Sequence, residues 1–230
     1  MAWLVRHGHE QNGGLQLKDS KAFKAHLNAY KAEAFGFRED DELGYSSGVP
    51  IPPPPHTVWF DNHAYEEKAT VDTWLQLIYS FGGMLASEAA REVIERHDPS
   101  VHAFYPVEID GWKVGPPPKQ YYLVNIRSLL PALDVERAVR DGVAKTQDVP
   151  EITQPYRLYE TLIMMNFWPK PEDPPKIFVK ESAVKGKGLW VQKGFNTFDL
   201  FMSDALVADI AALEDGFGGY EPTNRVGVIP

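Results

Sequence analysis

The sequence predicts an α+β fold, with a mostly antiparallel sheet and packed helices in a single globular unit with an N-terminal extension. Segments with helical spacing of apolar residues alternate irregularly with short strand-like segments, and hairpin connections outnumber the crossovers of a doubly wound fold. The chain has 230 residues, of which 43% are hydrophobic and 12% aromatic. This composition is typical of a packed domain and too apolar for disorder.

Four segments have the periodicity or the capping residues of helices. The predicted helices cover residues 17–35, 71–81, 88–97 and 204–215. Ser87 and Ser203 are the expected N-caps of the last two, and Gly82-Gly83 and Gly216 are expected to end the second and fourth. In the last helix the residues expected to face the core are Leu206, Val207, Ile210 and Leu213.

Short apolar or alternating segments predict the strands. They lie at residues 2–6, 57–60, 101–109, 120–127, 158–165, 176–181, 189–193, 198–202 and 220–229. We divide the chain into an N-terminal segment, residues 1–80, with a helix and a Pro-rich loop packed on the main domain, and an α+β domain, residues 81–230.

Composition excludes several classes of function. The chain has no cysteine, so a disulfide framework, a cysteine-ligated metal and a thiol nucleophile are excluded. The formal net charge of −9 disfavours nucleic acid and anionic membrane surfaces as partners, and it favours a basic protein partner. No segment reaches the roughly 18 apolar residues of a membrane helix, and the first residues lack a secretory pattern. We therefore expect a cytoplasmic protein.

Prolines divide the N-terminal region. Pro50 and the run Pro52 to Pro55 favour polyproline II and cannot lie inside a helix or a central strand. A stiff surface connector is the expected role, and a ligand for an aromatic groove of a partner is the alternative.

Residues 4–12 resemble the phosphohistidine loop of histidine phosphatases, through Arg6, His7 and Gly8. In that family a histidine at a strand end attacks phosphorus and an arginine binds the phosphate oxygens. The second histidine of that chemistry is followed by glycine, and no other histidine here has a glycine after it. The sequence therefore predicts ordinary strand-end residues at Arg6 and His7.

Three further motifs point to no chemistry. His7 and His9 could share one face of a strand, but no further ligand cluster accompanies them, so we expect no metal site and no cofactor. His97 and His102 flank a turn with Asp98 and are expected to be surface groups. The segment Lys185-Gly-Lys-Gly188 lacks the spacing of a phosphate-binding loop and predicts a hairpin turn.

Carboxylates are abundant, and the sequence does not show which of them converge. A hydrolase of a small molecule or glycan that uses two carboxylates therefore stays open as the alternative function.

One acidic segment stands out near the C-terminus. Residues 203–221 contain five acidic residues and no lysine or arginine. A solvated helix face explains such a segment, and a docking surface for a basic partner is the functional alternative. The residues expected to contact that partner are Asp209, Glu214, Asp215, Phe217 and Tyr220.

From residue 80 to residue 225 the order of several motifs is similar to that of a known family. The motifs begin with Leu85-Ala-Ser-Glu-Ala-Ala, Val93-Ile-Glu95, His102-Ala-Phe-Tyr-Pro-Val107 and Tyr121-Tyr-Leu-Val-Asn-Ile126. They continue with Leu133-Asp134, Glu136-Arg137, Ile177-Phe178, Phe201-Met-Ser-Asp-Ala-Leu206 and Gly218-Gly-Tyr220. This succession resembles immunity family eleven of the bacterial polymorphic toxin systems, formerly a domain of unknown function. The chain departs from the pattern at Ala138, where serine is usual, and at Val179, where arginine is usual.

The resemblance implies an α+β fold and an immunity-type protein that binds and neutralises a cognate bacterial toxin by stoichiometric occlusion. It implies no catalytic residue and no enzymatic activity. The expected partner is a toxin protein domain, and the acidic balance of the chain favours a basic one.

Overall fold

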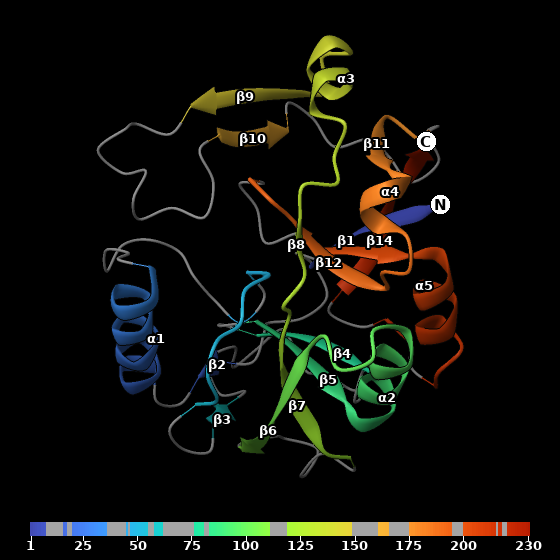
Figure 1. The fold of residues 1–230 in the computed structure, drawn as a ribbon. Helices are drawn as coiled ribbons and strands as arrows, with labels where there is room; N and C mark the ends of the chain where they lie inside the picture. Colours follow the sequence, from blue (N-terminus) through green and yellow to red (C-terminus); the bar gives the residue numbers. More distant parts are fainter. Residues whose placement is uncertain are drawn as a thin grey trace, which may run out of the picture.

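The computed structural model shows the arrangement of much of the chain (Figure 1). It describes residues 1–7, 16–17, 20–35, 45, 47–54, 58–61, 76–80, 83–110, 119–148, 161–165, 175–194, 200–214, 216–217 and 220–230. The statements below concern these residues.

Helices and strands are interspersed along the described chain. The helices are α1 (Ser20–Phe35), α2 (Glu88–His97), α3 (Val135–Arg140), α4 (Glu181–Val184) and α5 (Asp204–Ala211). The strands up to the middle of the chain are β1 (Ala2–His7), β2 (Gln16–Leu17), β3 (Val58–Asp61), β4 (Leu77–Ser80), β5 (Gly83–Ser87), β6 (Ala103–Asp110) and β7 (Tyr121–Asn125). The later strands are β8 (Leu129–Leu130), β9 (Ala144–Asp148), β10 (Thr161–Met165), β11 (Ile177–Lys180), β12 (Leu189–Gln192), β13 (Leu200–Ser203) and β14 (Tyr220–Ile229).

The predicted fold class is confirmed. Among the described strands, eight of the eleven pairings are antiparallel, and helices pack against the sheets. The strands form two sheets of six, ordered β11-β14-β1-β13-β12-β8 and β2-β3-β6-β7-β5-β4, and a pair, β10-β9.

The first sheet closes on itself. Its two edge strands are β8 and β11, and the chain that follows β8 runs alongside β11. Leu133 forms an antiparallel bridge with Val179, and the backbone N–H of Lys180 donates to the carbonyl of Ala132 at 2.8 Å. The chain after β8 therefore covers the edge of β11, so this strand is not the exposed edge of an open sheet.

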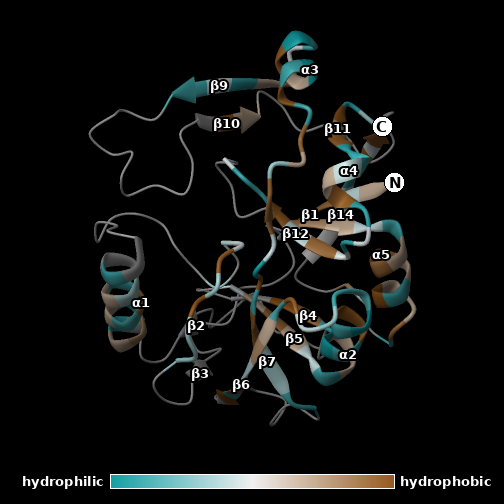
Figure 2. Ribbon diagram, in the orientation of Figure 1, coloured by the Kyte–Doolittle hydropathy of each residue, from teal (hydrophilic) through white to brown (hydrophobic). Residues whose placement is uncertain are grey.

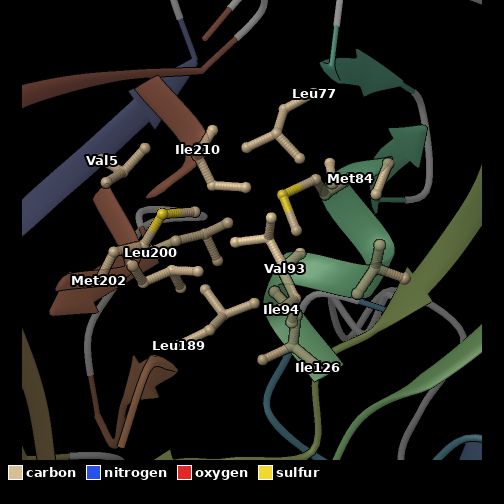
Figure 3. Packing of buried hydrophobic residues seen from close by; sticks show 14 of the residues in the cluster. Val5, Leu77, Met84, Val93, Ile94, Ile126, Leu189, Leu200, Met202 and Ile210 are labelled. Carbon is tan, nitrogen blue, oxygen red and sulfur yellow. The ribbon is translucent and has the colours of Figure 1, made fainter. Parts of the chain in front are cut away.

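The strands of the first sheet bury both of their faces. Along β12 and β13, Trp190 and Phe201 point into a core inside the curled sheet, where their rings stack with centroids 5.7 Å apart. The alternate residues Leu189, Leu200 and Met202 belong to a second core outside it, toward α2 and α5 (Figure 3). Successive side chains of a strand point to opposite faces, so one apolar run supplies both cores.

The second sheet separates two cores in the same way. On one face Met84, Ala86 and Val124 join the core shared with α2 and α5. On the other face Leu85 and Leu123 join a third core with α1. The hydropathy of the elements agrees with this layering. Strands β12 and β4, which lie between cores, are largely hydrophobic, whereas β9 and α2, which have exposed faces, are largely hydrophilic (Figure 2).

Both predicted N-caps are confirmed. The Ser87 hydroxyl accepts from the N–H of Ala90 at 3.1 Å, and the Ser203 hydroxyl accepts from the N–H of Leu206 at 3.2 Å. The buried residues of α5 are Leu206, Val207 and Ile210, as predicted from the spacing, and those of α2 are Ala90, Val93 and Ile94. Helix α5 ends at Ala211, earlier than predicted, and Leu213 is partly buried in the turn that follows.

The helix predicted over residues 71–81 is wrong where the structure describes it. Residues 77–80 form β4, which pairs with β5 so that Ser80 lies opposite Gly83. Leu77 and Ile78 are both buried, one on each face of the sheet. A strand buried on both faces has a continuous apolar run, which periodicity alone does not distinguish from a buried helix. Gly83 accordingly begins a strand and does not end a helix.

The hairpin predicted at Lys185–Gly188 is also wrong. Strand β11 pairs with β14, and β12 pairs with β13 and β8, so no hairpin joins β11 to β12. Helix α4 and a turn at residues 185–186 connect them.

The Pro-rich loop is more than a surface connector. Tyr45, Val49 and Ile51 are buried in the third core, although Pro50 and Pro53 are exposed.

Strand β1 lies between β13 and β14 in the first sheet, so part of the N-terminal segment is a central strand of the fold. The boundary that we place at residue 80 stays a prediction.

Candidate functional site

A buried carboxylate joins the two large sheets. Asp98 is the C-cap residue of α2, and its side chain is 1% exposed. Its Oδ1 accepts from the N–H of Gly188 at 2.9 Å, and its Oδ2 accepts from the N–H of Leu189 at 2.6 Å. The N–H groups belong to the start of β12 in the first sheet, whereas α2 follows β5 of the second sheet. One side chain therefore holds elements of both sheets together.

His102 completes the contacts of this carboxylate. Its side chain is fully buried, and Nε2 lies 3.2 Å from Asp98 Oδ2. The N–H of Arg127 points at His102 Nδ1 at 3.2 Å, so Nδ1 is the acceptor and the Nε2 proton is donated to Asp98. The prediction that His102 is a surface group is wrong.

The hydrogen bonds decide the charge of Asp98. Burial by itself raises the pKa of the Asp98 carboxyl, but the hydrogen bonds from His102, Gly188 and Leu189 outweigh it and hold that pKa below its usual range. The carboxylate is therefore anionic and hydrogen-bonded at neutral pH.

An Asp–His pair is a familiar element of catalytic triads. Whether this pair could act in catalysis depends on the second ring nitrogen of His102, Nδ1. A general base must have a free lone pair that can reach a substrate proton. His102 Nδ1 is already an acceptor for a backbone N–H in a fully buried position. The pair consequently has a structural role, which it performs by bracing α2 and β12.

Gly188 is required by the same contact. A Cβ at this position would lie 2.8 Å from Asp98 Oδ2 and 2.8 Å from His97 Cβ, closer than Cβ atoms normally approach. The glycine lets the β12 backbone come near enough for both N–H groups to reach the carboxylate.

Asp209 lies at the outer side of the same corner. Its Oδ2 is 2.8 Å from His97 Nε2 and 3.3 Å from Arg96 Nη2, which links α5 to α2. The side chain is 45% exposed. The hydrogen bond from His97, with the charge of Arg96, lowers the pKa of the Asp209 carboxyl.

The structure places the other residues of the expected partner surface in different settings. Glu214 is exposed in the turn after α5. Phe217 is partly buried against the core shared by the two sheets and bridges to Leu77 of β4. Tyr220 is the first residue of β14, opposite His7. Asp215 lies outside the described residues.

Sequence reasoning missed the acidic residues of α2. Glu88, Glu92 and Glu95 are exposed on this helix, which packs directly against α5 (Figure 1). Arg91 forms ion pairs with Glu88 and Glu95 at 3.2 and 3.8 Å. The two helices are more than 100 residues apart in sequence, and no local pattern indicates that they pack together.

The metal and phosphatase motifs gain no support from the described chain. Within the ranges that the structure describes, no group of three or more His, Asp and Glu side chains could hold a metal ion. His7 ends β1, and residues 8–15 of the phosphatase-like loop lie outside those ranges.

The fold is that of an α+β protein with two packed mixed sheets. The profile of the immunity protein family Imm11 matches residues 56–224, which is more than half of the chain. The chain belongs to this family, as the order of its motifs predicted. The match begins at residue 56, earlier than the motifs that we recognised. A comparison with curated proteins finds no match. In the described part of the chain, no helix is long and apolar enough to cross a membrane.

Several residues of the family-like motifs have structural roles. Asp134 is the N-cap of α3 and accepts from the N–H of Arg137 at 3.1 Å. The Arg137 guanidinium carbon lies 3.4 Å from the centroid of the Phe178 ring, a cation–π contact between α3 and β11. Tyr121 is buried in the third core. These motif residues therefore cap a helix, join α3 to β11 and fill the third core.

Proposed function

We propose that the protein binds and neutralises a cognate bacterial toxin of a polymorphic toxin system by stoichiometric occlusion, in the cytoplasm and without catalysis of its own. Membership of the Imm11 immunity family is the observation that supports this function. An immunity protein protects its own cell, so the toxin that it binds is expected to be encoded beside it.

The surface that we propose for this contact is the acidic face formed by α5, the residues after it, and α2. It contains Asp209 and Glu214, and α2, which packs on α5, adds three exposed glutamates. The proposed contact residues are Asp209, Glu214, Asp215, Phe217 and Tyr220. The surface fits a basic toxin domain, because opposite charges speed association and favour one orientation.

The members of this face differ in how free they are to bind. Asp209 already has Arg96 and His97 as partners inside the chain, so its charge is partly balanced. Glu214 is exposed in a turn, where its carboxylate can meet an incoming cation. Glu214 is therefore the first residue to change.

The first experiment measures stoichiometry. The toxin domain encoded by the neighbouring gene is assayed for its own activity while the immunity protein is titrated in. Occlusion predicts a linear loss of activity with an end point at one immunity protein for each toxin domain. Complete loss of activity at a small fraction of an equivalent would instead indicate that the protein destroys the toxin or its product catalytically.

The second experiment tests the surface. Glu214→Lys with Asp215→Lys is compared with Glu136→Lys and Asp148→Lys, which change the net charge equally but lie on α3 and β9 (Figure 1). At low salt we expect association with the toxin to slow about tenfold for the first pair only, and the salt dependence to weaken.

Equal slowing by both pairs would show that only the net charge matters, and unchanged association in the first pair would remove this face from consideration. Asp209→Lys forms a third arm, interpreted only if the urea midpoint stays at the wild-type value, because it also breaks the contacts with α2.

A further inference from the structure

Residues 49–54, which we call the strap, have the sequence Val49-Pro-Ile-Pro-Pro-Pro54 and contain no helix or strand. The strap is nevertheless bound along its length. Four successive backbone carbonyls each accept a hydrogen bond from a side chain. The donors are Asn125 Nδ2 to Val49 at 2.9 Å, Tyr30 to Pro50 at 2.5 Å, Tyr105 to Ile51 at 2.8 Å, and Tyr45 to Pro52 at 3.0 Å.

Asn125 holds the strap by both ends of its amide. Its Oδ1 accepts from the N–H of Ile51 at 2.8 Å, while Nδ2 donates to the carbonyls of Val49 and Tyr45. Asn125 is fully buried, so these bonds satisfy polar groups that have no access to water. Arg127 Nε donates to the same Oδ1 at 3.0 Å and fixes the orientation of the amide.

Apolar contacts complete the site. Ile51 is 1% exposed and enters the third core beside Leu123 and Tyr121, while Pro53 on the same strap is exposed. Burial raises the pKa of Tyr45 well above its usual range, so its hydroxyl stays a hydrogen-bond donor.

This arrangement has the chemistry of polyproline recognition. A proline-rich segment has a preformed extended backbone with free carbonyls, and receptors for it supply hydroxyl, amide and indole donors from an aromatic-lined groove. Here three of the donors come from α1, β6 and β7, the fourth is Tyr45, four residues before the strap, and three of the four donors are tyrosines. The aromatic ring of Tyr45 is 5.6 Å from those of Phe23 in α1 and Tyr105 in β6, so helix and sheet meet at Tyr45, whose hydroxyl donates to the Pro52 carbonyl.

We propose that the groove between α1 and the ends of β6 and β7 is a recognition site for an extended proline-rich peptide, and that the strap occupies it in cis. The site goes beyond toxin binding and does not depend on it. The alternative that these prolines are a ligand for a partner's groove is disfavoured, because their carbonyls and Ile51 are already bound within the chain.

Because the strap occupies the site within the same chain, we expect the wild type to show no binding of a free peptide at low concentration. A tethered segment has an effective concentration in the millimolar range, so a free peptide of the same affinity cannot compete with it at lower concentration. Weakening the strap without changing the groove should reveal the site.

The test uses the full chain with Ile51→Ala, which removes the apolar side chain of the strap and leaves every donor in place. A fluorescent peptide with the sequence of residues 47–54 is titrated by anisotropy. We expect saturable binding to Ile51→Ala at least tenfold tighter than to the wild type, and no binding of a control peptide in which the isoleucine is aspartate.

The groove residues are then tested in the Ile51→Ala background. Tyr105→Phe removes the donor to the Ile51 carbonyl and should weaken the peptide several-fold. Tyr122→Phe on the neighbouring strand is the matched control, since its hydroxyl contacts Glu88 and not the strap. Near-ultraviolet circular dichroism establishes that each variant is folded.

Two results would overturn the proposal. One is the absence of binding to folded Ile51→Ala at about 1 mM peptide, the effective concentration expected for a short tether. The other is equal binding of the native and the aspartate peptide. If Ile51→Ala does not fold, Val49→Ala weakens the strap by a smaller deletion, and the same outcomes apply to it.

Discussion

Two aspartates at one corner of the molecule have similar partners and opposite surroundings. Asp98 and Asp209 each lie within hydrogen-bond distance of a histidine Nε2, at 3.2 and 2.8 Å. The side chain of Asp98 is 1% exposed and also accepts from two backbone N–H groups, whereas that of Asp209 is 45% exposed and has Arg96 as its second partner.

The difference between them is one of desolvation. Removing Asp98 would leave two backbone N–H groups and a histidine without partners in a place that water does not reach. Removing Asp209 would leave groups that water can solvate. We therefore expect the aspartate with the shorter histidine contact to contribute less to stability, because the cost of a lost hydrogen bond depends on whether water can replace it.

The largest effect should come from Asp98→Ala. The N–H groups of Gly188 and Leu189 would become unsatisfied, at about 1–3 kcal/mol each, so we expect a loss of about 3–5 kcal/mol in the free energy of unfolding. Urea titration measures it. A loss below about 1 kcal/mol would mean that water or another side chain replaces the carboxylate.

Gly188→Ala tests the same contact from the other strand. The new Cβ would meet Asp98 Oδ2 and His97 Cβ at 2.8 Å, and we expect a loss of about 1–3 kcal/mol by overpacking. A urea midpoint for Gly188→Ala equal to that of the wild type would contradict the close approach of α2 and β12.

The pH dependence of stability should differ between the wild type and Asp98→Asn, in which an amide replaces the carboxylate. Since its folded-state pKa lies below the ordinary value of 3.8, the carboxylate contributes stability that is fully present above that pH and is lost as pH falls through the folded-state pKa. Asp98→Asn should therefore be less stable than the wild type at pH 7, with a gap that narrows below about pH 4. Thermal unfolding of both proteins from pH 7 to pH 2.5 provides the test. A stability difference that does not change with pH would show that the charge of the Asp98 carboxylate is not its cause.

Asp209→Asn should have the smallest effect. Its neighbours Arg96 and His97 can turn to water, so we expect a urea midpoint close to that of the wild type at pH 7. If Asp209→Asn destabilised the protein as much as Asp98→Asn, exposure would not be what distinguishes the two aspartates.

Local signals in the sequence predicted local structure well. Ser87 and Ser203 each precede an amphipathic segment, and a serine hydroxyl can cap an N–H three residues away wherever the helix finally packs. The failure at residues 77–80 has the opposite cause. Leu77 and Ile78 are both apolar because each faces a different core, and this is decided by what lies on either side of the sheet.

The candidate surface was predicted in part. The acidic residues of the C-terminal segment are visible in the sequence, but the packing of α2 against α5 and the pairing of Asp209 with Arg96 are not. The residue types of the turn that contains His97, Asp98 and His102 suggest a site, but the sequence predicts only surface histidines there. Its role was missed, because the partners of Asp98 are 90 and 91 residues away.

The sequence by itself determined the fold class, the helix caps, most of the strands, the acidic charge and, through the order of its motifs, the immunity family. Only the tertiary structure decided that the first sheet closes on itself, that Asp98 joins α2 to β12, and that the proline-rich strap is held by tyrosines from α1 and β6. The physical reason is range. Capping and periodicity act within a few residues, whereas a buried carboxylate or a bound strap is defined by donors that the fold brings from distant parts of the chain.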